Sequence, residues 1–284
     1  MTTNACTART RSPGAMGSGE DARDLREDAP SGREATTPRL LRAWRYTHLA
    51  LLLARGVATV ALRYPFCSAA RRRALRQRWS ARMLEVLGIR LEHRGSPIAP
   101  GCMLIANHIS WVDIFVINAL APAAFVSKAE VRDWPVIGWL AARNDTIFLR
   151  RGSRGHARII NAETAALLDT GSNVAIFPEG TTTDGGTLLH FHAALLQPAI
   201  ACGHAVQTLA LQYRTPEDHF SSAPAYIGEM SLGACVANIV ARRKTLARIT
   251  VAEPITTTEG TDRRVLAVRA RSEIAAAIGV ELPD

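Results

Sequence analysis

A histidine and an aspartate lie five positions apart in the segment Asn107-His108-Ile109-Ser110-Trp111-Val112-Asp113. The apolar run 103–106 before it predicts a buried strand, and the apolar residues after it predict a helix that Ser110 caps and that holds Asp113 in its first turn. On one continuous helix, side chains five positions apart diverge by roughly 140°. We therefore expect His108 to lie on the turn before the helix, where its ring can reach back to the Asp113 carboxylate.

Such a pair suits general-base catalysis. If one ring nitrogen of His108 donates to Asp113, the other can accept a proton from a substrate hydroxyl. The carboxylate would fix the tautomer and stabilise the imidazolium, as an aspartate does in a hydrolase triad. A purely structural interpretation stays open, because Ser110-x-x-Asp113 also fits a capping box with Asp in place of Glu or Gln, and the helix dipole favours an acidic first turn.

Length and composition allow one large domain with additional elements. The chain has 284 residues, of which 48% are hydrophobic, enough for a proper core. Its five cysteines are scattered, without a Cys-x-x-Cys pair, which argues against a disulfide framework or a structural zinc site and favours a reducing compartment. His190 and His192 form a His-x-His pair, but no further Cys or His lies at a ligand-like spacing, so we expect no metal site.

The basic charge is concentrated in one segment. Residues 39–94 hold thirteen arginines and two glutamates, a net charge of +11, whereas the whole chain carries +9. A cluster of this size can hold a protein on an anionic membrane surface, at about 1 kcal/mol per arginine. A solvated charged face and a nucleic-acid site are the alternatives. No recognisable motif for reading nucleic acid accompanies the cluster, so we expect no nucleic-acid partner.

Two amphipathic helices are expected within this segment. The apolar run 46–62 contains Arg55 and is shorter than the ~20 residues that cross a bilayer, which favours a helix lying in the membrane interface over a single spanning anchor. A second helix follows Arg71-Arg72-Arg73. Its apolar side comprises Leu75, Trp79, Met83, Leu84 and Leu87, with Arg76, Arg78 and Arg82 on the cationic side.

Composition divides the chain into three parts. Residues 1–38 are rich in Thr, Ser, Gly, Pro and charge, lack the apolar core of a signal peptide and are expected to be disordered. Residues 39–88 form the basic, membrane-associated helical pair, and residues 89–284 form an α/β domain. Predicted strands (89–93, 102–106, 123–127, 145–149, 173–177, 206–212 and 247–252) alternate there with predicted helices (111–120, 135–142, 154–169, 192–202, 233–243 and 262–278). This alternation predicts a mixed, largely parallel sheet with helices on both faces, which binds ligands beyond the carboxyl ends of its strands.

Further polar residues follow the predicted strands. Lys128 follows strand 123–127, and Arg150 and Arg151 follow strand 145–149, where a guanidinium suits a phosphate or carboxylate group. Because neighbouring strand residues point to opposite faces, only one of these two arginines should reach a shared site. Strand 173–177 runs into a turn rich in glycine and threonine that can form a polar, concave loop.

Other chemistries lack their motifs. Ser110 and Ser153 have no Gly-x-Ser-x-Gly context, which disfavours a serine hydrolase. Neither a Gly-x-x-x-x-Gly-Lys loop nor a Gly-x-Gly-x-x-Gly turn occurs, which disfavours nucleotide binding.

Taken in order, these segments resemble the glycerolipid acyltransferase family, the bacterial 1-acylglycerol-3-phosphate acyltransferases and their lysophospholipid and lyso-ornithine-lipid relatives. The resemblance covers roughly residues 39–255. The family's Asn-His-x4-Asp motif matches 107–113, its strand ending in arginine matches 147–151 with Arg151 at the motif position, and its Phe-Pro-Glu-Gly-Thr motif matches 177–181 in full.

Two departures bear on the acceptor. Many members that use a phosphate acceptor carry arginine after Phe-Pro-Glu-Gly-Thr, where this chain has Thr182, and a fourth motif usually has proline where this chain has Thr208. Losing the arginine removes one cation from the expected headgroup site. The resemblance thus puts a phosphate-monoester acceptor in question and leaves room for a larger lyso-lipid.

The resemblance implies transfer of a fatty acyl group from acyl-CoA or acyl-carrier protein to the free hydroxyl of a lyso-lipid, such as 1-acylglycerol-3-phosphate or lyso-ornithine lipid. His108 would be the general base and Asp113 would orient it, without an acyl-enzyme, a metal or a bound cofactor. Residues expected to bind the acceptor are Lys128, Arg151, Glu179, Gly180 and Thr181. The helical pair would seat the enzyme on the anionic cytoplasmic face of the inner (plasma) membrane. The alternative is a non-catalytic basic module that binds membrane or nucleic acid.

Overall fold

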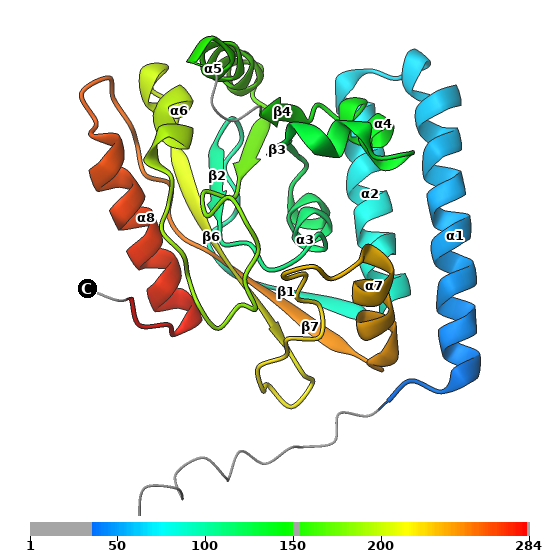
Figure 1. The fold of residues 1–284 in the computed structure, drawn as a ribbon. Helices are drawn as coiled ribbons and strands as arrows, with labels where there is room; N and C mark the ends of the chain where they lie inside the picture. The colour runs from blue at the N-terminus through cyan, green and yellow to red at the C-terminus, as the bar shows by residue number, and fades with distance from the viewer. Residues whose placement is uncertain (1–35, 150–153, 283–284) are drawn as a thin grey trace, which may run out of the picture. The chain divides into compact units, whose positions relative to one another are not determined.

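A seven-stranded sheet organises the computed structural model, which describes residues 36–149 and 154–282 (Figure 1). The strands are β1 (Ile89–Gly95), β2 (Met103–Ala106), β3 (Ala123–Lys128), β4 (Ile147–Leu149), β5 (Asn173–Ile176), β6 (Val206–Arg214) and β7 (Thr245–Val251). Their order is β1-β7-β6-β2-β5-β3-β4, and each neighbouring pair is parallel except β6 and β7. The predicted mixed, largely parallel sheet is confirmed.

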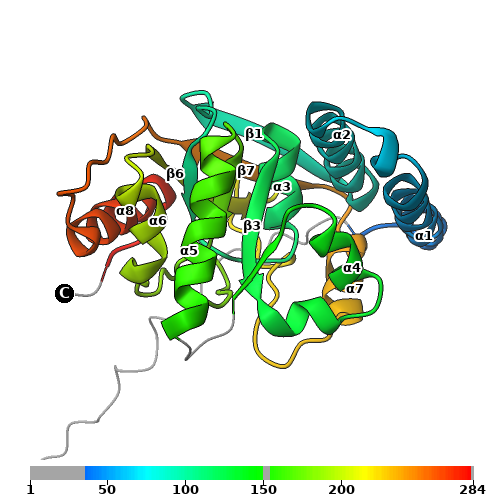
Figure 2. The same ribbon diagram turned by 90° about the horizontal axis from the view of Figure 1, so that it is seen from above.

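Helices cover both faces of this sheet (Figure 2). On one face lie α2 (Ala69–Leu87), α3 (Asp113–Leu120) and α7 (Leu232–Ala241), and on the other α5 (Arg154–Asp169), α6 (Gln197–Ala201) and α8 (Arg263–Ile278). Strand β2 is buried on both faces: Leu104 packs into the first layer, and Met103 and Ile105 pack into the second. A strand of this kind shows an uninterrupted apolar run, which is why the sequence revealed it.

Two predicted helices differ from those observed. The prediction 192–202 is divided into a 3-10 turn, η3 (Ala193–Leu196), and α6, which has proline at its start. The prediction 135–142 becomes α4 (Ile137–Ala142), preceded by the 3-10 turn η2 (Ala129–Asp133). Proline lacks the N–H that a continuous helix needs, so each helix begins beside it.

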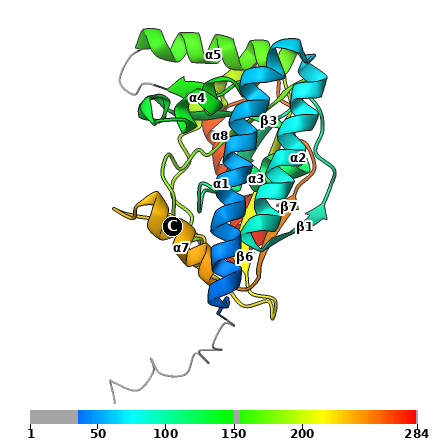
Figure 3. The same ribbon diagram turned by 90° about the vertical axis from the view of Figure 1, so that its right-hand side faces the viewer.

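The expected N-terminal helical pair is present. Helix α1 (Arg39–Leu62) packs outside α2, and the 3-10 turn η1 (Tyr64–Phe66) joins them (Figure 3). The indole N–H of Trp79 in α2 donates to the Leu52 carbonyl of α1 at 3.0 Å. Within the described residues, no helix is both long and apolar enough to cross a membrane.

One arginine of the basic segment, Arg45, closes the end of helix α7. Its buried guanidinium donates to the carbonyl oxygens of Val240, Arg242 and Arg243 at 3.2, 2.6 and 2.7 Å. The last carbonyls of a helix have no partner within the helix, so a side chain that reaches them stabilises its end. Burial lowers the pKa of Arg45 from its ordinary value.

Arg76 is also buried, so its predicted place on a solvent-facing cationic side of the second helix is wrong. Its guanidinium donates to the Asn144 carbonyl at 2.7 Å and lies 3.6 Å from the Asp145 carboxylate. The phenol of Tyr64 donates to the Asn144 side chain at 2.9 Å. These contacts tie the turn between α1 and α2 to the segment that follows α4.

Residues 1–35 of the predicted disordered tail lie outside the described residues. The last part of that tail, residues 36–38, differs from the prediction. Thr36 forms a β-bridge with Arg242, and the backbone N–H of the buried Thr37 donates to the Ala241 carbonyl at 2.9 Å. These residues therefore pack beside the end of α7.

Candidate active site

His108 and Asp113 lie at the carboxyl end of β2, one on the connecting turn and one at the first position of α3. Nδ1 of His108 lies 2.8 Å from Oδ2 of Asp113. Since an ionised carboxylate only accepts hydrogen bonds, Nδ1 carries the proton and Nε2 is the basic nitrogen. The contact predicted from the spacing is present.

The two side chains differ in exposure. The His108 side chain keeps 20% of its surface exposed, whereas that of Asp113 is fully buried. No hydrogen bond to Nε2 of His108 comes from any residue that the structure describes. One ring nitrogen is thus bound to a buried acid, and the ring keeps part of its surface open to solvent.

The Asp113 carboxylate also closes the turn before α3. Its Oδ2 atom accepts the backbone N–H groups of Ile109 and Ser110 at 2.7 and 2.9 Å. The catalytic and the structural interpretations are thus compatible, because one carboxylate makes both kinds of contact. The predicted cap was wrong: α3 has Val112 at its N-cap position and no side-chain cap, and Ser110 Oγ accepts the Val112 N–H at 3.3 Å.

Tyr213 of β6 belongs to this site and was missed by sequence analysis. Its phenol donates to Oδ1 of Asp113 at 2.7 Å. Burial, followed by the neighbouring Asp113 charge, raises the pKa of Tyr213 well above its ordinary value, so the phenol remains a donor at neutral pH. The available signal was the alternation Leu209, Leu211, Tyr213 on one strand face, but the predicted strand ended at residue 212.

The Phe-Pro-Glu-Gly-Thr loop after β5 and the residues that follow it form hydrogen bonds with the backbone of His108. The N–H of His108 donates to Oε1 of Glu179 at 2.8 Å, and its carbonyl accepts from the N–H of Thr183 at 2.9 Å. The other Glu179 oxygen accepts from the Leu189 N–H at 2.9 Å. Burial raises the pKa of Glu179, although both N–H groups oppose that shift. Glu179 therefore joins the turn after β2 to the segment that contains Leu189 through hydrogen bonds.

The same loop also supports the imidazole ring. The rings of His108 and Phe177 stack with their centroids 3.9 Å apart and their planes 12° from parallel. Phe125 of β3 stacks behind Phe177 at 6.1 Å. Gly180 turns the chain in a left-handed conformation, φ 70°, that other residues rarely adopt. The position of the His108 ring is thus fixed by stacking on one face, by the hydrogen bond at Nδ1 and by the hydrogen bonds of the His108 backbone.

Thr182, where many phosphate-using relatives are expected to have arginine, makes a structural contact. Its hydroxyl donates to the carbonyl of Tyr226, and the Tyr226 N–H donates to the Ile109 carbonyl at 3.0 Å. The segment after β6 is thereby joined to the loops that follow β2 and β5. Position 182 therefore supplies no cation, and its hydroxyl is already hydrogen-bonded to the Tyr226 carbonyl.

Asn107, the first residue of the motif, extends the sheet with its side chain. Its amide donates to the carbonyl of Leu211 at 3.0 Å, and its amide oxygen accepts the N–H of the same residue at 2.7 Å. This pairing continues the contact between β2 and β6 by one residue. It fixes the point at which the chain turns toward His108.

The remaining predicted site residues are placed less directly. Lys128 ends β3, and its exposed side chain makes no hydrogen bond within the described part of the chain. Thr181 is exposed beside Gly180. Arg150 and Arg151 lie outside the described residues. The structure therefore brings His108, Asp113 and Glu179 together and leaves the acceptor contacts of the others as predictions.

Within residues 36–149 and 154–282, no three His, Cys, Asp or Glu side chains lie close enough together to hold one metal ion. The rings of His190 and His192 lie 6.2 Å apart and nearly perpendicular.

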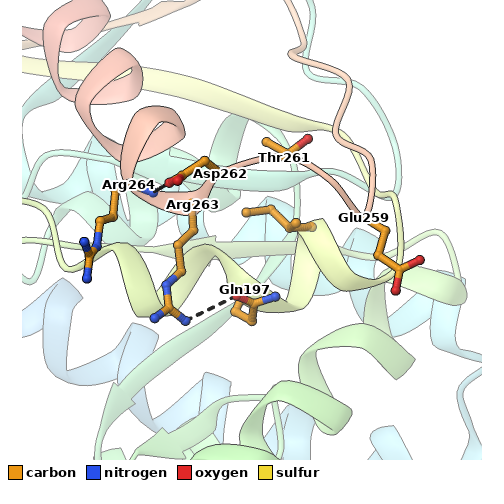
Figure 4. A pocket seen from close by; sticks show the side chains of 7 residues that line it. Gln197, Glu259, Thr261, Asp262, Arg263 and Arg264 are labelled. Atoms are coloured by element: carbon orange, nitrogen blue, oxygen red, sulfur yellow. Dashed lines mark hydrogen bonds between the residues drawn. The ribbon is translucent and has the colours of Figure 1, made fainter.

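A pocket of about 350 Å³ is lined by residues of α6 and the start of α8 (Figure 4). Arg263 donates to the side chain of Gln197 there at 3.3 Å. The Asp262 carboxylate accepts the Arg264 N–H at 2.6 Å and so already occupies the N-terminus of α8. Since neither residue of the His–Asp pair lines this pocket, it is separate from the site.

The fold and the site define a mixed α/β protein with a buried acid that orients a partly exposed histidine. A family model described as Acyltransferase matches residues 89–212. The lyso-ornithine lipid O-acyltransferase of Pseudomonas aeruginosa is 40% identical over 208 residues, which cover 72% of this chain and 80% of that protein. The 1-acyl-sn-glycerol-3-phosphate acyltransferase of Neisseria meningitidis is 35% identical over 198 residues, covering 69% and 77%.

The chain therefore belongs to the acyltransferase family and is an acyl-transferring enzyme. Its fold is similar to that of the 1-acyl-sn-glycerophosphate (LPA) acyltransferase PlsC from Thermotoga maritima, with a TM-score of 0.65 and 19% identity, over 86% of this chain and 97% of that one. Family membership favours the enzyme over the non-catalytic basic module.

Proposed function

We propose that this enzyme transfers a fatty acyl group from acyl-CoA or acyl-carrier protein to the free hydroxyl of a lyso-lipid, with His108 as general base. The observation that carries the proposal is the His108 Nδ1 contact to the buried Asp113, which leaves Nε2 as the basic nitrogen of a partly exposed ring. The names of the two relatives, both acyltransferases of lyso-lipid acceptors, support the substrate class.

In the proposed mechanism, Nε2 of His108 takes the proton of the acceptor hydroxyl as its oxygen attacks the thioester carbonyl carbon. Asp113 stabilises the imidazolium that forms. Collapse of the tetrahedral intermediate breaks the C–S bond, and the departing thiolate recovers the proton from the imidazolium. The products are an ester and a free thiol, and no step needs a metal, a bound cofactor or an acyl-enzyme.

For the acceptor, Thr182 favours a lyso-lipid without a phosphate monoester, such as lyso-ornithine lipid. A phosphate monoester carries up to two negative charges and is best bound by arginine. Thr182 supplies none, and its hydroxyl is engaged by the Tyr226 carbonyl. The Pseudomonas relative, named for lyso-ornithine lipid, points the same way. Lys128, Arg151, Gly180 and Thr181 are the proposed acceptor-binding residues, and 1-acylglycerol-3-phosphate is the competing acceptor.

The enzyme is proposed to act as a peripheral protein on the cytoplasmic face of the inner membrane. Exposed arginines of α1 and α2 support contact with anionic lipid. The four cysteines of the described residues are free thiols, in keeping with a reducing compartment.

The test is release of thiol from acyl-CoA in the presence of lyso-ornithine lipid, 1-acylglycerol-3-phosphate or other lyso-lipids. We expect His108→Ala to lower the rate by roughly 100-fold to 10,000-fold, the usual contribution of a positioned base. His190→Ala, an exposed histidine outside the pair, is the matched control and should retain the wild-type rate. Undiminished transfer by the His108 variant would remove the mechanism.

A further inference from the structure

Exposed apolar side chains are concentrated in the segment Trp134-Pro135-Val136-Ile137-Gly138-Trp139, between β3 and β4. Trp134, Val136, Ile137 and Trp139 each keep between 36% and 45% of their surface exposed. Single exposed apolar residues are normal, but several gathered in one short segment mark a contact surface. We call these residues the 134–139 segment.

The backbone of this segment is held in a tight and strained turn. Val136 has φ 63° and ψ −50°, and the N–H of Ile137 donates to the Pro135 carbonyl at 2.6 Å, a γ-turn with positive φ that a β-branched residue rarely adopts. The N–H of Gly138 donates to the Trp134 carbonyl at 2.9 Å, and a Cβ at Gly138 would lie 2.1 Å from the carbonyl oxygen of Arg132. Strain of this kind persists where the exposed arrangement has a use.

A second exposed apolar group lies next to it, on the turn between α1 and α2. Leu62 is 70% exposed and Phe66 is 89% exposed. Tyr64 of the same turn and Arg76 both bind Asn144, two residues beyond α4. In Figure 1, α4 accordingly lies beside the end of α2 that follows this turn. The two apolar groups thus share one edge of the molecule.

The charges around this edge are net positive, which suits an anionic lipid surface: the exposed arginines outnumber the exposed Glu130, Asp133 and Asp145. Arg132 and Arg143 lie over the rings of Phe148 and Trp139 at 5.6 and 5.7 Å, with both guanidinium groups exposed. Exposed arginines on either side of the neighbouring turn add further positive charge: Arg63, Arg71 and Arg72. Tryptophan beside arginine is typical of the membrane interface, where the ring enters the headgroup layer and the cation binds phosphate.

We propose that the 134–139 segment is a second membrane-contact element, which enters the interface of an anionic bilayer together with the turn between α1 and α2. The proposal rests on the proposed function, because the acceptor must be a membrane lipid for this contact to serve catalysis. The segment leaves the sheet from β3, whose Phe125 stacks on Phe177, the ring that supports His108. Docking here brings the reactive edge of the sheet to the lipid surface.

The decisive variant is Val136→Asp with Ile137→Asp in the full chain. Both side chains are partly exposed, 45% at Val136 and 36% at Ile137, so the two changes should leave most of the packing of the fold intact. Two new anionic groups replace two apolar ones on the contact surface. We expect partition onto vesicles of equal parts phosphatidylglycerol and phosphatidylcholine to fall at least roughly tenfold.

The matched control is Val265→Asp with Val268→Asp on α8. These two valines are more exposed than Val136 and Ile137. They lie on α8, which covers the sheet face opposite to the one that α2 covers. The control makes the same chemical change and should leave vesicle partition unaltered. Equal vesicle binding by wild type and the Val136/Ile137 variant would overturn the proposal and leave the segment to a protein partner.

Thiol release separates this proposal from the proposed function. With a short-chain lyso-lipid presented as monomers, the Val136/Ile137 variant should retain the wild-type rate, whereas with an acceptor embedded in vesicles it should lose at least roughly tenfold. An equal loss with both acceptors would overturn the proposal, because the segment would then serve the reaction site itself. A wild type that releases no thiol but binds vesicles through this segment would contradict the proposed function alone.

Discussion

The phenol of Tyr213 and the imidazole of His108 bind opposite oxygens of the same buried carboxylate, that of Asp113, at 2.7 and 2.8 Å. The two donors reach Asp113 from β6 and from the turn after β2. In the proposed mechanism, Tyr213 would act on His108 through the acid, as a positioning residue without contact to the reacting atoms. Charge-assisted hydrogen bonds of this length are stronger than neutral ones, so the phenol should influence both the position and the charge of the carboxylate.

Replacing Tyr213 by phenylalanine should alter the pH dependence of the reaction. Losing a hydrogen bond to a charged group costs roughly 1.5–3 kcal/mol of stability. The carboxylate, with one donor fewer, concentrates more charge on His108 and favours its imidazolium form. We expect kcat/KM to fall roughly tenfold, about 1.4 kcal/mol, and the acid limb of its pH profile to move to higher pH. Thiol release measured across pH 5 to 9 checks both.

The matched control for that prediction is Tyr64→Phe, which removes a buried phenol bound to Asn144, away from the pair. It should cost stability without moving the acid limb. If both variants left the limb in place, Tyr213 would have only a structural role.

Variants of the two paired residues should both lose activity and should differ in stability. His108→Ala removes one of the four donors to the Asp113 carboxylate, so it should lower the transfer rate by roughly 100-fold to 10,000-fold and the unfolding free energy by roughly 1.5–3 kcal/mol, as Tyr213→Phe does. Asp113→Asn places an amide among four donors and should abolish transfer while also destabilising the fold by about 1–3 kcal/mol for each donor left without an acceptor. Denaturant unfolding beside the thiol assay checks the pair. Equal stability of the two variants would contradict the role of Asp113 in closing the turn before α3.

The contact between His108 and Asp113 could be predicted because it is local. Strand, turn and helix are set by neighbouring residues, and because side chains five positions apart on one helix diverge, only a His108 on the turn before the helix can reach Asp113. The role of Tyr213 could not be predicted in this way, since it joins the site from 100 residues away through the pairing of β6 with β2. Sequence patterns define a strand but do not specify which strand it pairs with.

Glu179 shows that a sequence motif can identify a residue without predicting its tertiary contacts. The Phe-Pro-Glu-Gly-Thr loop identified the residue, but its contacts to the N–H groups of His108 and Leu189 depend on tertiary packing. Arg45 and Arg76 show the same limit for charge, because a count of arginines does not distinguish an exposed cation from one that binds buried carbonyls. Patterns thus predicted the elements and the reactive pair, and packing determined what supports them.

Glu179 predicts a pH dependence of stability. Burial raises the pKa of Glu179 above the ordinary value of 4.5. At pH values between 4.5 and this raised pKa, the folded protein therefore retains a proton that the unfolded chain has lost. The folded state binds more protons there, and the free energy of unfolding should decrease as pH rises through this range. Glu179→Gln cannot titrate, so the stability advantage of wild type over this variant should narrow from pH 4.5 toward neutrality.

Denaturant unfolding at several pH values measures this difference, with Glu163→Gln at an exposed position of α5 as the matched control. An advantage that widened toward neutral pH would mean that the N–H groups of His108 and Leu189 stabilise the carboxylate more than burial opposes it.

Two arginines of the basic segment should respond in opposite ways to the same substitution. Arg45→Met leaves the carbonyls at the end of α7 without their donor and should destabilise the fold by roughly 2–4 kcal/mol. Arg71 lies at an exposed position of α2, so Arg71→Met should change the free energy of unfolding by less than about 0.5 kcal/mol. Partition onto anionic vesicles should show the reverse order, since an exposed cation contributes about 1 kcal/mol near the lipid surface and a buried one contributes nothing there. Unfolding curves and vesicle sedimentation of the two variants check this crossed pattern. If Arg45→Met weakened vesicle binding while the fold kept its stability, Arg45 would be a lipid-binding residue and its capping role would be wrong.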